Sequence, residues 1–391
     1  MSWDTIRAEE YCESVRDGTH DTPKPVSNGY KLVTGKHIQN GQIDPTDAYF
    51  ISENDYRKIN ERSKVEKWDV LMSMIGNGLG RSAVVKKEPD YAIKNIALFK
   101  VGDEKKAKWL HYYLSSPQGQ GFIYNSLQGS GQPFISLSFI RDFPIPTPPL
   151  SYLNKAVSIL EIYDDLIENN QKQIKLLEEA AQRLYKEWFV DLRFPGYENV
   201  KVVDGVPEGW RKVQLSEIAD IVMGQSPKSE FYNTDKQGLP FHQGVSSYGT
   251  RFVVDDTYST AFTKIAEAGS ILFSVRAPVG RLNLTKNKIV IGRGLSAINH
   301  KTGLQSFMFY MLKEKFYKDN IVGNGSIFAS ISKNELLSQE FIIPNDELSK
   351  RYNAIVLDID KIIESLDSQL QLLTEARDRL LPKLMSGELE V

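Results

Sequence analysis

Cysteine is nearly absent from this chain of 391 residues, in which Cys12 is the only one. A single thiol can form neither an internal disulfide nor a cysteine-based metal cluster, and this scarcity is typical of a reducing compartment. The N-terminal segment MSWDTIRAEE has no apolar core of the kind found in a signal peptide. Long apolar runs are also missing, since none approaches the ~18 residues of a membrane span. We therefore expect a cytoplasmic protein.

Catalytic signatures are equally scarce. The sequence lacks a P-loop, a His-Glu-x-x-His zinc motif, a Cys-x-x-Cys pair, a nucleophile elbow and the Asn/Asp-Pro-Pro-Tyr/Phe run of adenine methyltransferases. One short pattern, Asp90 followed by Asp103 and Lys105, matches the PD-(D/E)xK type of metal-dependent nuclease. It has no counterpart in the second half, and acids at a helix start also favour the helix dipole. We expect no catalytic residue and no metal ligand, with the nuclease kept as an alternative.

Two long amphipathic stretches dominate what is present. Apolar residues recur at steps of three and four over 150–189 and again over 348–385, with no glycine inside either stretch. This spacing predicts two long helices, each with one apolar stripe. A rod of that length needs a partner along its side, so we expect the two helices to pack antiparallel as a coiled coil within one chain. Pairing between two chains remains an alternative.

The chain is also a duplication. The segment LLEEA at 176–180 aligns with LLTEA at 372–376, and the buried-strand and Gly-Arg segments around Gly80 and Gly280 repeat in the same order. The glycine-rich segment 129–138 likewise matches 323–332. The repeat predicts an α+β protein with two similar mixed globular halves, each followed by a long helix. The expected boundaries are 1–149, helix 150–190, linker 191–209, 210–345 and helix 346–391.

Charge is distributed unevenly over these parts. Residues 210–345 carry 16 basic and 11 acidic side chains, whereas residues 151–209 carry 7 and 11. The first half, 1–150, is nearly balanced at 19 and 18, and 346–391 has 6 and 10. This asymmetry favours a polyanion as the ligand of the globular halves and protein as the partner of the helices.

Glycine-containing loops that carry arginine predict a binding surface. Glycine lets backbone amides approach a phosphate, and arginine reaches either a phosphate or the guanine edge. The repeated Gly-Arg segments and the polar loops around Thr19 and Gln225 are the candidates. Large apolar residues at the ends of the long helices, such as Trp188 and Leu384, are expected to be exposed and to contact a partner.

Several segments together resemble a known family. They are Asp17-Gly18-Thr19-His20, Met223-Gly224-Gln225-Ser226-Pro227, Glu208-Gly209-Trp210 and the C-terminal LLPKLMSGE from Leu380. Over its whole length the chain resembles the specificity (S) subunit of type I restriction–modification enzymes. The first half departs from the pattern because it lacks the Pro-x-Gly-Trp entry, which leaves the start of that domain open.

The resemblance implies a non-catalytic subunit. Each half is expected to be a target-recognition domain that reads one part of a bipartite, asymmetric DNA site, with the helix pair as a ruler. Two modification subunits are expected to dock on the helices with S-adenosylmethionine and to methylate adenine at N6. Restriction subunits with ATP and Mg²⁺ complete the complex. An interaction scaffold without a DNA role is the remaining alternative.

The resulting site prediction has two parts. The expected DNA-binding residues are Thr19, His20, Lys24, Lys36, Arg81, Gln225, Ser226, Lys228, Ser247, Tyr248, Arg276, Arg281 and Arg293. The expected partner-binding residues are Leu177, Leu184, Trp188, Phe189, Leu373, Leu380, Leu384 and Met385.

Overall fold

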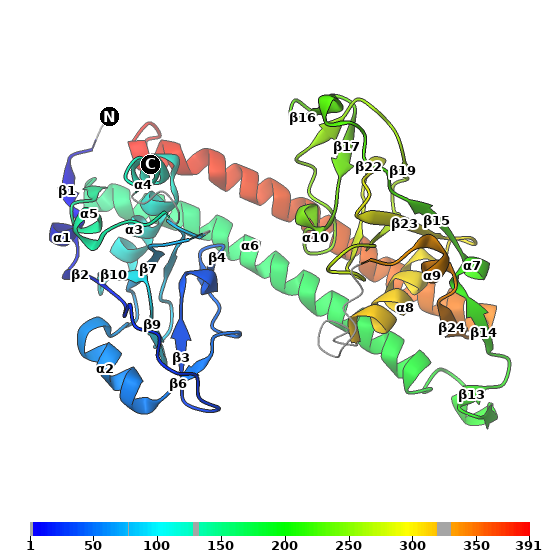
Figure 1. The fold of residues 1–391 in the computed structure, drawn as a ribbon. Helices are drawn as coiled ribbons and strands as arrows, with labels where there is room; N and C mark the ends of the chain where they lie inside the picture. Colours follow the sequence, from blue (N-terminus) through cyan, green and yellow to red (C-terminus); the bar gives the residue numbers. More distant parts are fainter. Residues whose placement is uncertain (1–2, 77, 128–132, 319–329) are drawn as a thin grey trace. The chain divides into compact units, whose positions relative to one another are not determined.

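The computed structural model describes residues 3–76, 78–127, 133–318 and 330–391. Most of the predicted glycine-rich match, residues 129–132 and 323–329, lies outside the described residues. The chain divides into two compact units. Unit 1 comprises Met1–Asn169 with Gln369–Val391, and unit 2 comprises Asn170–Ser368. Figure 1 shows the elements of both units, coloured along the sequence.

Unit 1 is built on a four-stranded antiparallel sheet in the order β2-β10-β7-β8. The strands are β2 (Ser14–Asp17), β10 (Ile96–Lys100), β7 (Val70–Ser73) and β8 (Ser82–Val84). All four residues of β7 are buried, as expected for a strand with packing on both faces. Helix α3 (Glu104–Ser115) places Ala107, Leu110 and Leu114 in the same apolar cluster as this sheet.

A smaller sheet in unit 1 has the order β6-β3-β9. Its strands are β6 (Phe50–Ile51), β3 (Tyr30–Val33) and β9 (Tyr91–Ile93), and β3 is parallel to β9 and antiparallel to β6. Helix α2 (Glu53–Ser63) is capped at its N-terminus by Ser52, whose side chain accepts from the Asp55 amide. The remaining elements are β1 (Thr5–Arg7), α1 (Ala8–Tyr11), β4 (Ile38–Gln39), β5 (Gln42–Ile43), α4 (Pro117–Tyr124), α5 (Leu137–Arg141) and β11 (Pro144–Pro146), which pairs with β1.

Unit 2 repeats this frame. Its main sheet has the order β15-β23-β20-β21, with β15 (Ala219–Met223), β23 (Leu295–His300), β20 (Ile271–Ser274) and β21 (Leu282–Leu284). The second sheet again contains one parallel pair, β17 (Leu239–His242) with β22 (Ile289–Ile291), and β18 (Tyr258–Ser259) antiparallel to β17. Strands β16 (Tyr232–Asn233) and β19 (Ile265–Ala266) extend it. The predicted duplication is therefore confirmed, and the two second sheets differ.

The other elements of unit 2 keep the same order along the chain. They are β12 (Val202–Val203), β13 (Val206–Pro207), β14 (Arg211–Gln214), α7 (Leu215–Ile218), α8 (Gln305–Lys318), α9 (Lys333–Leu337) and β24 (Glu340–Ile343). Strand β14 pairs with β24 just as β1 pairs with β11 in unit 1. Each pair ties the start of a globular half to the segment that leads into a long helix.

Both predicted long helices are present. Helix α6 spans Leu150–Tyr185 and continues into a π-helical turn over Lys186–Val190, and helix α10 spans Asp346–Ser386. None of the helices among the described residues is long and apolar enough to cross a membrane.

The two long helices pack antiparallel, as predicted. In unit 1 the start of α6, with Leu153 and Val157, shares an apolar cluster with Leu381 and Leu384 at the end of α10. In unit 2, farther along α6, Ile174 packs with Ile363 and Leu366 in the first half of α10. Residue numbers thus rise along one helix as they fall along the other. A coiled-coil seam of this kind buries the apolar stripe of both helices.

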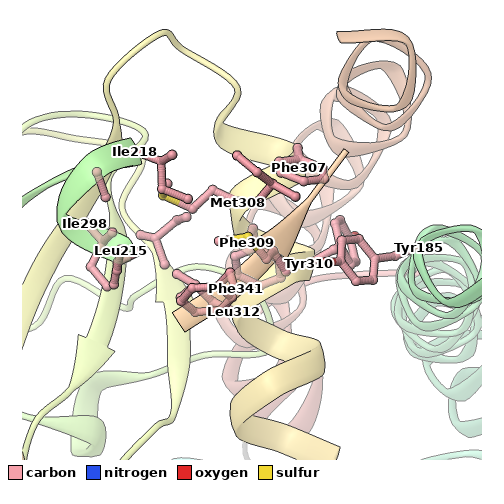
Figure 2. Close-up of a cluster of buried hydrophobic side chains, with 14 of the residues drawn as sticks. Tyr185, Leu215, Ile218, Ile298, Phe307, Met308, Phe309, Tyr310, Leu312 and Phe341 are labelled. Atoms are coloured by element: carbon pink, nitrogen blue, oxygen red, sulfur yellow. The ribbon is translucent and has the colours of Figure 1, made fainter. Parts of the chain in front are cut away.

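The core of unit 2 is unusually aromatic (Figure 2). Tyr185 of α6 faces the buried row of Phe307, Phe309 and Tyr310 on α8. The hydroxyl of Tyr352 donates to the Ala181 carbonyl oxygen at 2.9 Å, which links α10 to α6 inside this core.

The expected exposure of bulky residues at the helix ends is wrong for three of them. Trp188 is 7% exposed within the aromatic core, and Leu384 and Met385 are 0% and 3% exposed in the cluster that receives Leu153. Each helix end is covered by its own unit, a contact between distant segments that periodicity along one helix does not reveal. The remaining five predicted partner residues, Leu177, Leu184, Phe189, Leu373 and Leu380, are half-buried.

A half-buried histidine lies where α3 meets the main sheet of unit 1. The Nδ1 atom of His111 lies 2.9 Å from the Ser82 hydroxyl, and a methyl group on Gly41 would lie 3.2 Å from its Nε2 atom. Burial lowers the pKa of His111 to about 4, although the nearby Asp164 carboxylate acts in the opposite direction. The ring is therefore neutral in the folded protein near pH 7.

Acid is expected to destabilise the protein through His111. The unfolded chain takes up this proton near pH 6.5 and the folded chain only near pH 4, so the contribution is complete above pH 6.5 and is lost as the pH falls between these values. The full difference between these pKa values corresponds to about 3.4 kcal/mol. Because the His111 ring is half-buried, we expect a loss on the order of 2 kcal/mol in the free energy of unfolding. Urea unfolding at several pH values measures it.

The matched variant is His111→Asn, whose amide can still accept from Ser82. Burial also lowers the pKa values of His37 and His300. The pH dependence that these two residues contribute is therefore present in both the unaltered protein and the His111→Asn variant. The variant curve is expected to be shallower between pH 6.5 and 4. Two parallel curves would contradict the assignment.

Candidate nucleic-acid interface

Two of the predicted polar loops occupy corresponding places in the two units. In unit 1 the chain leaves β2 at Gly18, whose amide donates to the Ile96 carbonyl oxygen at 2.9 Å, and Thr19 donates to Ile93 at 3.0 Å. In unit 2 the chain leaves β15 at Gly224, where the amides of Gly224 and Gln225 donate to Leu295 and Ile291, both at 2.9 Å. We call 18–24 with 94–95 the first edge, and 224–228 with 292–294 the second edge.

A glycine begins each edge because the backbones come very close. A methyl group on Gly18 would lie 2.4 Å from the Ile93 carbonyl oxygen, and one on Gly224 would lie 2.1 Å from that of Gly292. Side-chain atoms do not tolerate such distances, so only glycine fits at both positions. The close approach holds the following residues, Thr19 and Gln225, against the ends of the parallel strand pair.

The first edge contains a buried acid and an oriented histidine. The ring of His20 lies 2.9 Å from Asp17 Oδ2 through Nε2 and 2.9 Å from Asn95 Oδ1 through Nδ1. Asp17 is only 4% exposed and also accepts from Arg62. Since both ring nitrogens already have partners, the exposed face of the His20 ring, rather than its nitrogens, is open to a ligand.

Two lysines belong to the first edge, and two further predicted cations lie elsewhere in unit 1. Lys94 donates to the Thr22 hydroxyl, and Lys24 is exposed. Lys36 pairs with Asp47 at 2.9 Å, and this hydrogen bond lowers the pKa of the Asp47 carboxyl. A methyl group on Gly78 would lie 3.4 Å from Arg81 Cδ and 3.5 Å from the Gly35 carbonyl oxygen, so the Arg81 side chain lies beside the segment that carries Lys36.

The second edge is hollowed. A depression of about 720 Å³ is lined by Gln225, Ser226, Pro227, Lys228, Ser229, Glu230, Tyr232, Gln243 and Arg293. Four of the predicted residues, Gln225, Ser226, Lys228 and Arg293, therefore come together around one space. The Ser226 hydroxyl donates to Gln243 Oε1 at 2.8 Å and accepts from the Arg293 amide at 3.2 Å, which joins three chain segments at this point.

Arg293 is presented between two glycines. A methyl group on Gly292 would lie 2.8 Å from Gln243 Oε1, and one on Gly294 would lie 2.5 Å from the Gln243 carbonyl oxygen. The Arg293 side chain is exposed, and within the described part of the chain no carboxylate pairs with it. A guanidinium on a tightly packed backbone is suited to a phosphate or to a guanine edge.

Two other predicted residues of unit 2, Ser247 and Tyr248, are less accessible. The Ser247 hydroxyl lies 2.8 Å from Nδ1 of His242, which is fully buried. The Tyr248 hydroxyl is buried without a hydrogen-bond partner among the described residues, and burial raises its pKa. Tyr248 therefore packs into unit 2, and its hydroxyl does not face outward.

The Gly-Arg segments close hairpin turns, which corrects their expected backbone role. Gly80 and Gly280 have φ values of 80° and 88° and lie between β7 and β8 and between β20 and β21. Their amides donate to the carbonyl oxygens of Ser73 and Ser274, so they are not available to a phosphate. Among the arginine side chains of these segments, Arg81 and Arg276 are exposed, and Arg281 is half-buried.

Two residues of the nuclease pattern, Asp103 and Lys105, make structural contacts. Asp103 caps α3 by accepting from the Lys106 amide at 2.9 Å, and Lys105 pairs with Glu161 of α6 at 2.5 Å. The described residues contain no group of three or more His, Cys, Asp or Glu side chains arranged to hold a metal ion. These contacts give Asp103 and Lys105 structural roles.

Sequence reasoning missed several residues of the two edges. Asp17 joins the first edge through His20, three residues along the chain, whereas Arg62 and Asn95 join it, and Gln243 joins the second edge, through contacts between separate segments. Two signals were available: Asn95 has φ 53°, which favours asparagine, and Arg293 is flanked by glycines. Exposed apolar residues on the long helices, above all Leu176 and Leu372, were missed as well.

Comparison with known proteins gives a consistent result. The family model of the type I restriction modification DNA specificity domain matches residues 2–179 and 207–375. A Methanocaldococcus jannaschii protein, named as the specificity subunit of the type I restriction enzyme MjaX, is 28% identical over 400 residues, covering 100% of this chain and 94% of that protein. The HindI specificity subunit of Haemophilus influenzae is 23% identical, covering 84% and 88%.

A solved structure has the same fold. The crystal structure of the type I restriction–modification S subunit from M. genitalium aligns with a TM-score of 0.58 at 16% identity, covering 98% of this chain and 96% of that one. Together with two family-model matches that cover both repeats, this establishes the assignment. The chain belongs to the DNA specificity subunits of type I restriction–modification systems, which bind DNA in a complex and are not themselves catalytic.

Proposed function

We propose that this specificity subunit reads a bipartite, asymmetric DNA site, one part with each globular half. The observation that carries the proposal is that the same strand frame occurs twice and presents unlike polar groups at corresponding edges. The first edge presents Thr19 and His20, whereas the second presents Gln225, Ser226 and Arg293. Unlike groups on one frame favour unlike half-sites.

The side chains of the second edge suit base recognition in the major groove. Arginine pairs with guanine O6 and N7, and glutamine pairs with adenine N6 and N7. Gln225, Gln243 and Arg293 supply both kinds around one hollow. Lys228, with a side chain 82% exposed, is suited to a phosphate contact, which fixes position without reading sequence.

The remaining predicted DNA-binding residues belong to this proposal with different roles. Lys24, Lys36, Arg81, Arg276 and Arg281 supply cations near the edges or the adjoining turns. Ser247 and Tyr248 support the fold of unit 2 and do not themselves contact DNA. The proposed boundaries are 1–149 for the first domain and 150–190 for the helix that follows it. The linker 191–209 leads from that helix to the second domain, 210–345, which the helix 346–391 follows.

We propose further that the long helices dock two modification subunits, which carry S-adenosylmethionine, and that restriction subunits carry ATP and Mg²⁺. Exposed apolar residues recur at corresponding helix positions: Leu166 matches Ile362, and Leu176 matches Leu372, each pair 196 residues apart. Such side chains are 43% to 66% exposed, and repetition of one apolar surface favours two copies of one partner. Of the partner-binding residues predicted from the sequence, Leu177 and Leu373 are half-buried and lie directly next to Leu176 and Leu372.

Methylation mapping tests the bipartite site. The chain is co-expressed with its cognate modification subunit, and N6-methyladenine is located genome-wide by single-molecule sequencing. Two unlike short motifs separated by a fixed gap are expected. A continuous palindrome would instead indicate a homodimer that reads DNA through one kind of domain, and would overturn the proposal.

Arg293 is expected to contribute to recognition by the second edge. Arg293→Met in the assembled methyltransferase should weaken binding by about 1–3 kcal/mol and relax one base position if the side chain reads guanine. If it contacts a phosphate, the loss is uniform and the slope of log affinity against log salt falls by about one. Duplex titrations at several salt concentrations distinguish the two.

Arg211→Met is the matched control for that experiment. Arg211 is 59% exposed on β14, in the same unit, and does not line the hollow. It is expected to bind like the unaltered protein. Equal losses for Arg211→Met and Arg293→Met would mean that only overall charge matters.

Leu176 and Leu372 are expected to hold one modification subunit each. Leu176→Ser or Leu372→Ser should remove one copy, and the double variant should remove both, because burial of a leucine contributes about 1.5–3 kcal/mol. Native mass spectrometry of the co-purified complex counts the copies. Val203→Ser, at a side chain 57% exposed outside both helices, is the control and should keep both copies.

A further inference from the structure

A short hairpin in unit 2, residues 247–254, touches both the long helices and the second edge. The Val254 amide donates to the Ser247 carbonyl oxygen at 2.9 Å, and Gly249 donates to Phe252 at 3.1 Å. Its returning strand lies beside β21, since Leu284 donates to the Arg251 carbonyl oxygen at 3.0 Å. The hairpin is therefore a well-bonded element with one side on the sheet.

Arg251 anchors the hairpin to both long helices. It is only 1% exposed, yet its guanidinium lies 2.6 Å from Asp360 of α10 and 3.5 Å from Glu178 of α6. The guanidinium carbon lies 3.6 Å from the ring centre of Phe309. Asp360 also accepts from Ser306 of α8 at 2.6 Å. One buried cation thus joins α6, α10 and the recognition domain.

Phe252 supplies the apolar part of the same contact. It is 9% exposed and packs with Ile174 of α6 and with Ile363 and Leu366 of α10. Next to it, Lys286 pairs with Asp367 at 2.7 Å and lies 4.6 Å from the Phe252 ring. Together these contacts leave the hairpin little freedom to slide along the helices.

The other strand of the hairpin reaches the second edge. Ser247 contacts Nδ1 of His242 at 2.8 Å, and Nε2 of His242 lies 3.0 Å from Asp255, which also accepts from Asn287 at 3.2 Å. The next residue, Gln243, lines the hollow and bonds Ser226. A continuous chain of contacts thus runs from the helix pair to the proposed base-reading groups.

Unit 1 is attached differently. Asp164 corresponds to Asp360 in the repeat, but its cation is Arg377 of α10 itself, at 3.0 Å. The globular half reaches Asp164 through the Tyr112 hydroxyl on α3, at 2.7 Å. Among the described residues, the attachment of a hairpin by a buried arginine is therefore a feature of unit 2.

We infer that the 247–254 hairpin fixes the position of the second edge relative to the helix pair, and that Arg251 is the positioning residue that sets how strictly the gap between the two half-sites is measured. The inference rests on the proposed bipartite site. The helix pair can set the gap only if the second edge is held in a fixed position on it, and Arg251 with Phe252 supplies that rigidity. Arg251 is buried away from solvent and acts through the hairpin.

The experiment compares binding to duplexes with the mapped gap and with the gap changed by one base pair. The complex with cognate modification subunits is used. The readout is the Kd for the duplex with the changed gap divided by the Kd for the duplex with the mapped gap, called the ratio below. For Arg251→Met we expect this ratio to fall by about tenfold, the factor that corresponds to 1.4 kcal/mol of lost coupling. Arg251→Lys keeps the charge but cannot contact Glu178 and Asp360 at once through a planar guanidinium. Its ratio is expected to lie between those of the unaltered complex and of Arg251→Met.

Two further variants separate positioning from stability. Lys100→Met is the matched control, because it also removes a cation from a buried carboxylate, Asp69, but in the sheet of unit 1. It should lower the Tm and keep the ratio. The double variant Arg251→Met, Asp360→Asn removes the buried carboxylate that loses its cation, while Glu178 keeps Lys313 at 3.7 Å, and should regain Tm while the ratio stays low.

Three results would overturn the inference. Arg251→Met could keep the ratio of the unaltered complex, or the double variant could restore the ratio together with the Tm, in which case Arg251 contributes stability alone. Lys100→Met could reduce the ratio as much as Arg251→Met, so that any loss of stability has this effect. If the unaltered complex itself does not discriminate between gaps, the proposed bipartite function fails first.

Discussion

The apolar seam between α6 and α10 is the constraint on which both units depend. Helices of 36 and 41 residues gain most of their stability from packing rather than from propensity, and each of these buries its stripe against the other. Each unit contains one end of each helix, with Leu153 meeting Leu384 in unit 1 and Ile174 meeting Ile363 in unit 2. Neither globular half is complete without both helices.

Carboxylates on the helices determine how each sheet is attached to the seam. Glu161 receives Lys105 and Lys108 of α3, and Asp360 receives Ser306 and Arg251. Burying a charge costs free energy that pairing only partly returns, so such contacts contribute more to a unique geometry than to stability. In a subunit that measures DNA, a unique geometry is what the contacts must supply.

The two edges show how one frame supports two specificities. The strand frame is apolar and repeats closely, and glycines at Gly18 and Gly224 hold the chain against the parallel pair in both units. The residues that follow differ, and unit 2 adds strands β16 and β19 to its second sheet, of which β16 lines the hollow through Tyr232. Sequence changes confined to these polar positions leave the core, and hence the fold, intact.

The sequence by itself determined what local pattern controls. A spacing of three and four residues predicted both helices, self-similarity predicted the duplication, and the positions of Gln225, Ser226 and Arg293 marked polar loops that lie at one hollow. Only the tertiary structure decided three other features. These are which end of a helix is covered, which amide of a Gly-Arg turn is occupied, and which distant side chain completes an edge. Trp188 is buried, the Gly280 amide closes a hairpin, and Gln243 reaches Ser226. The physical reason is that periodicity records the environment along one segment, whereas burial and hydrogen bonding depend on which distant segment packs against it.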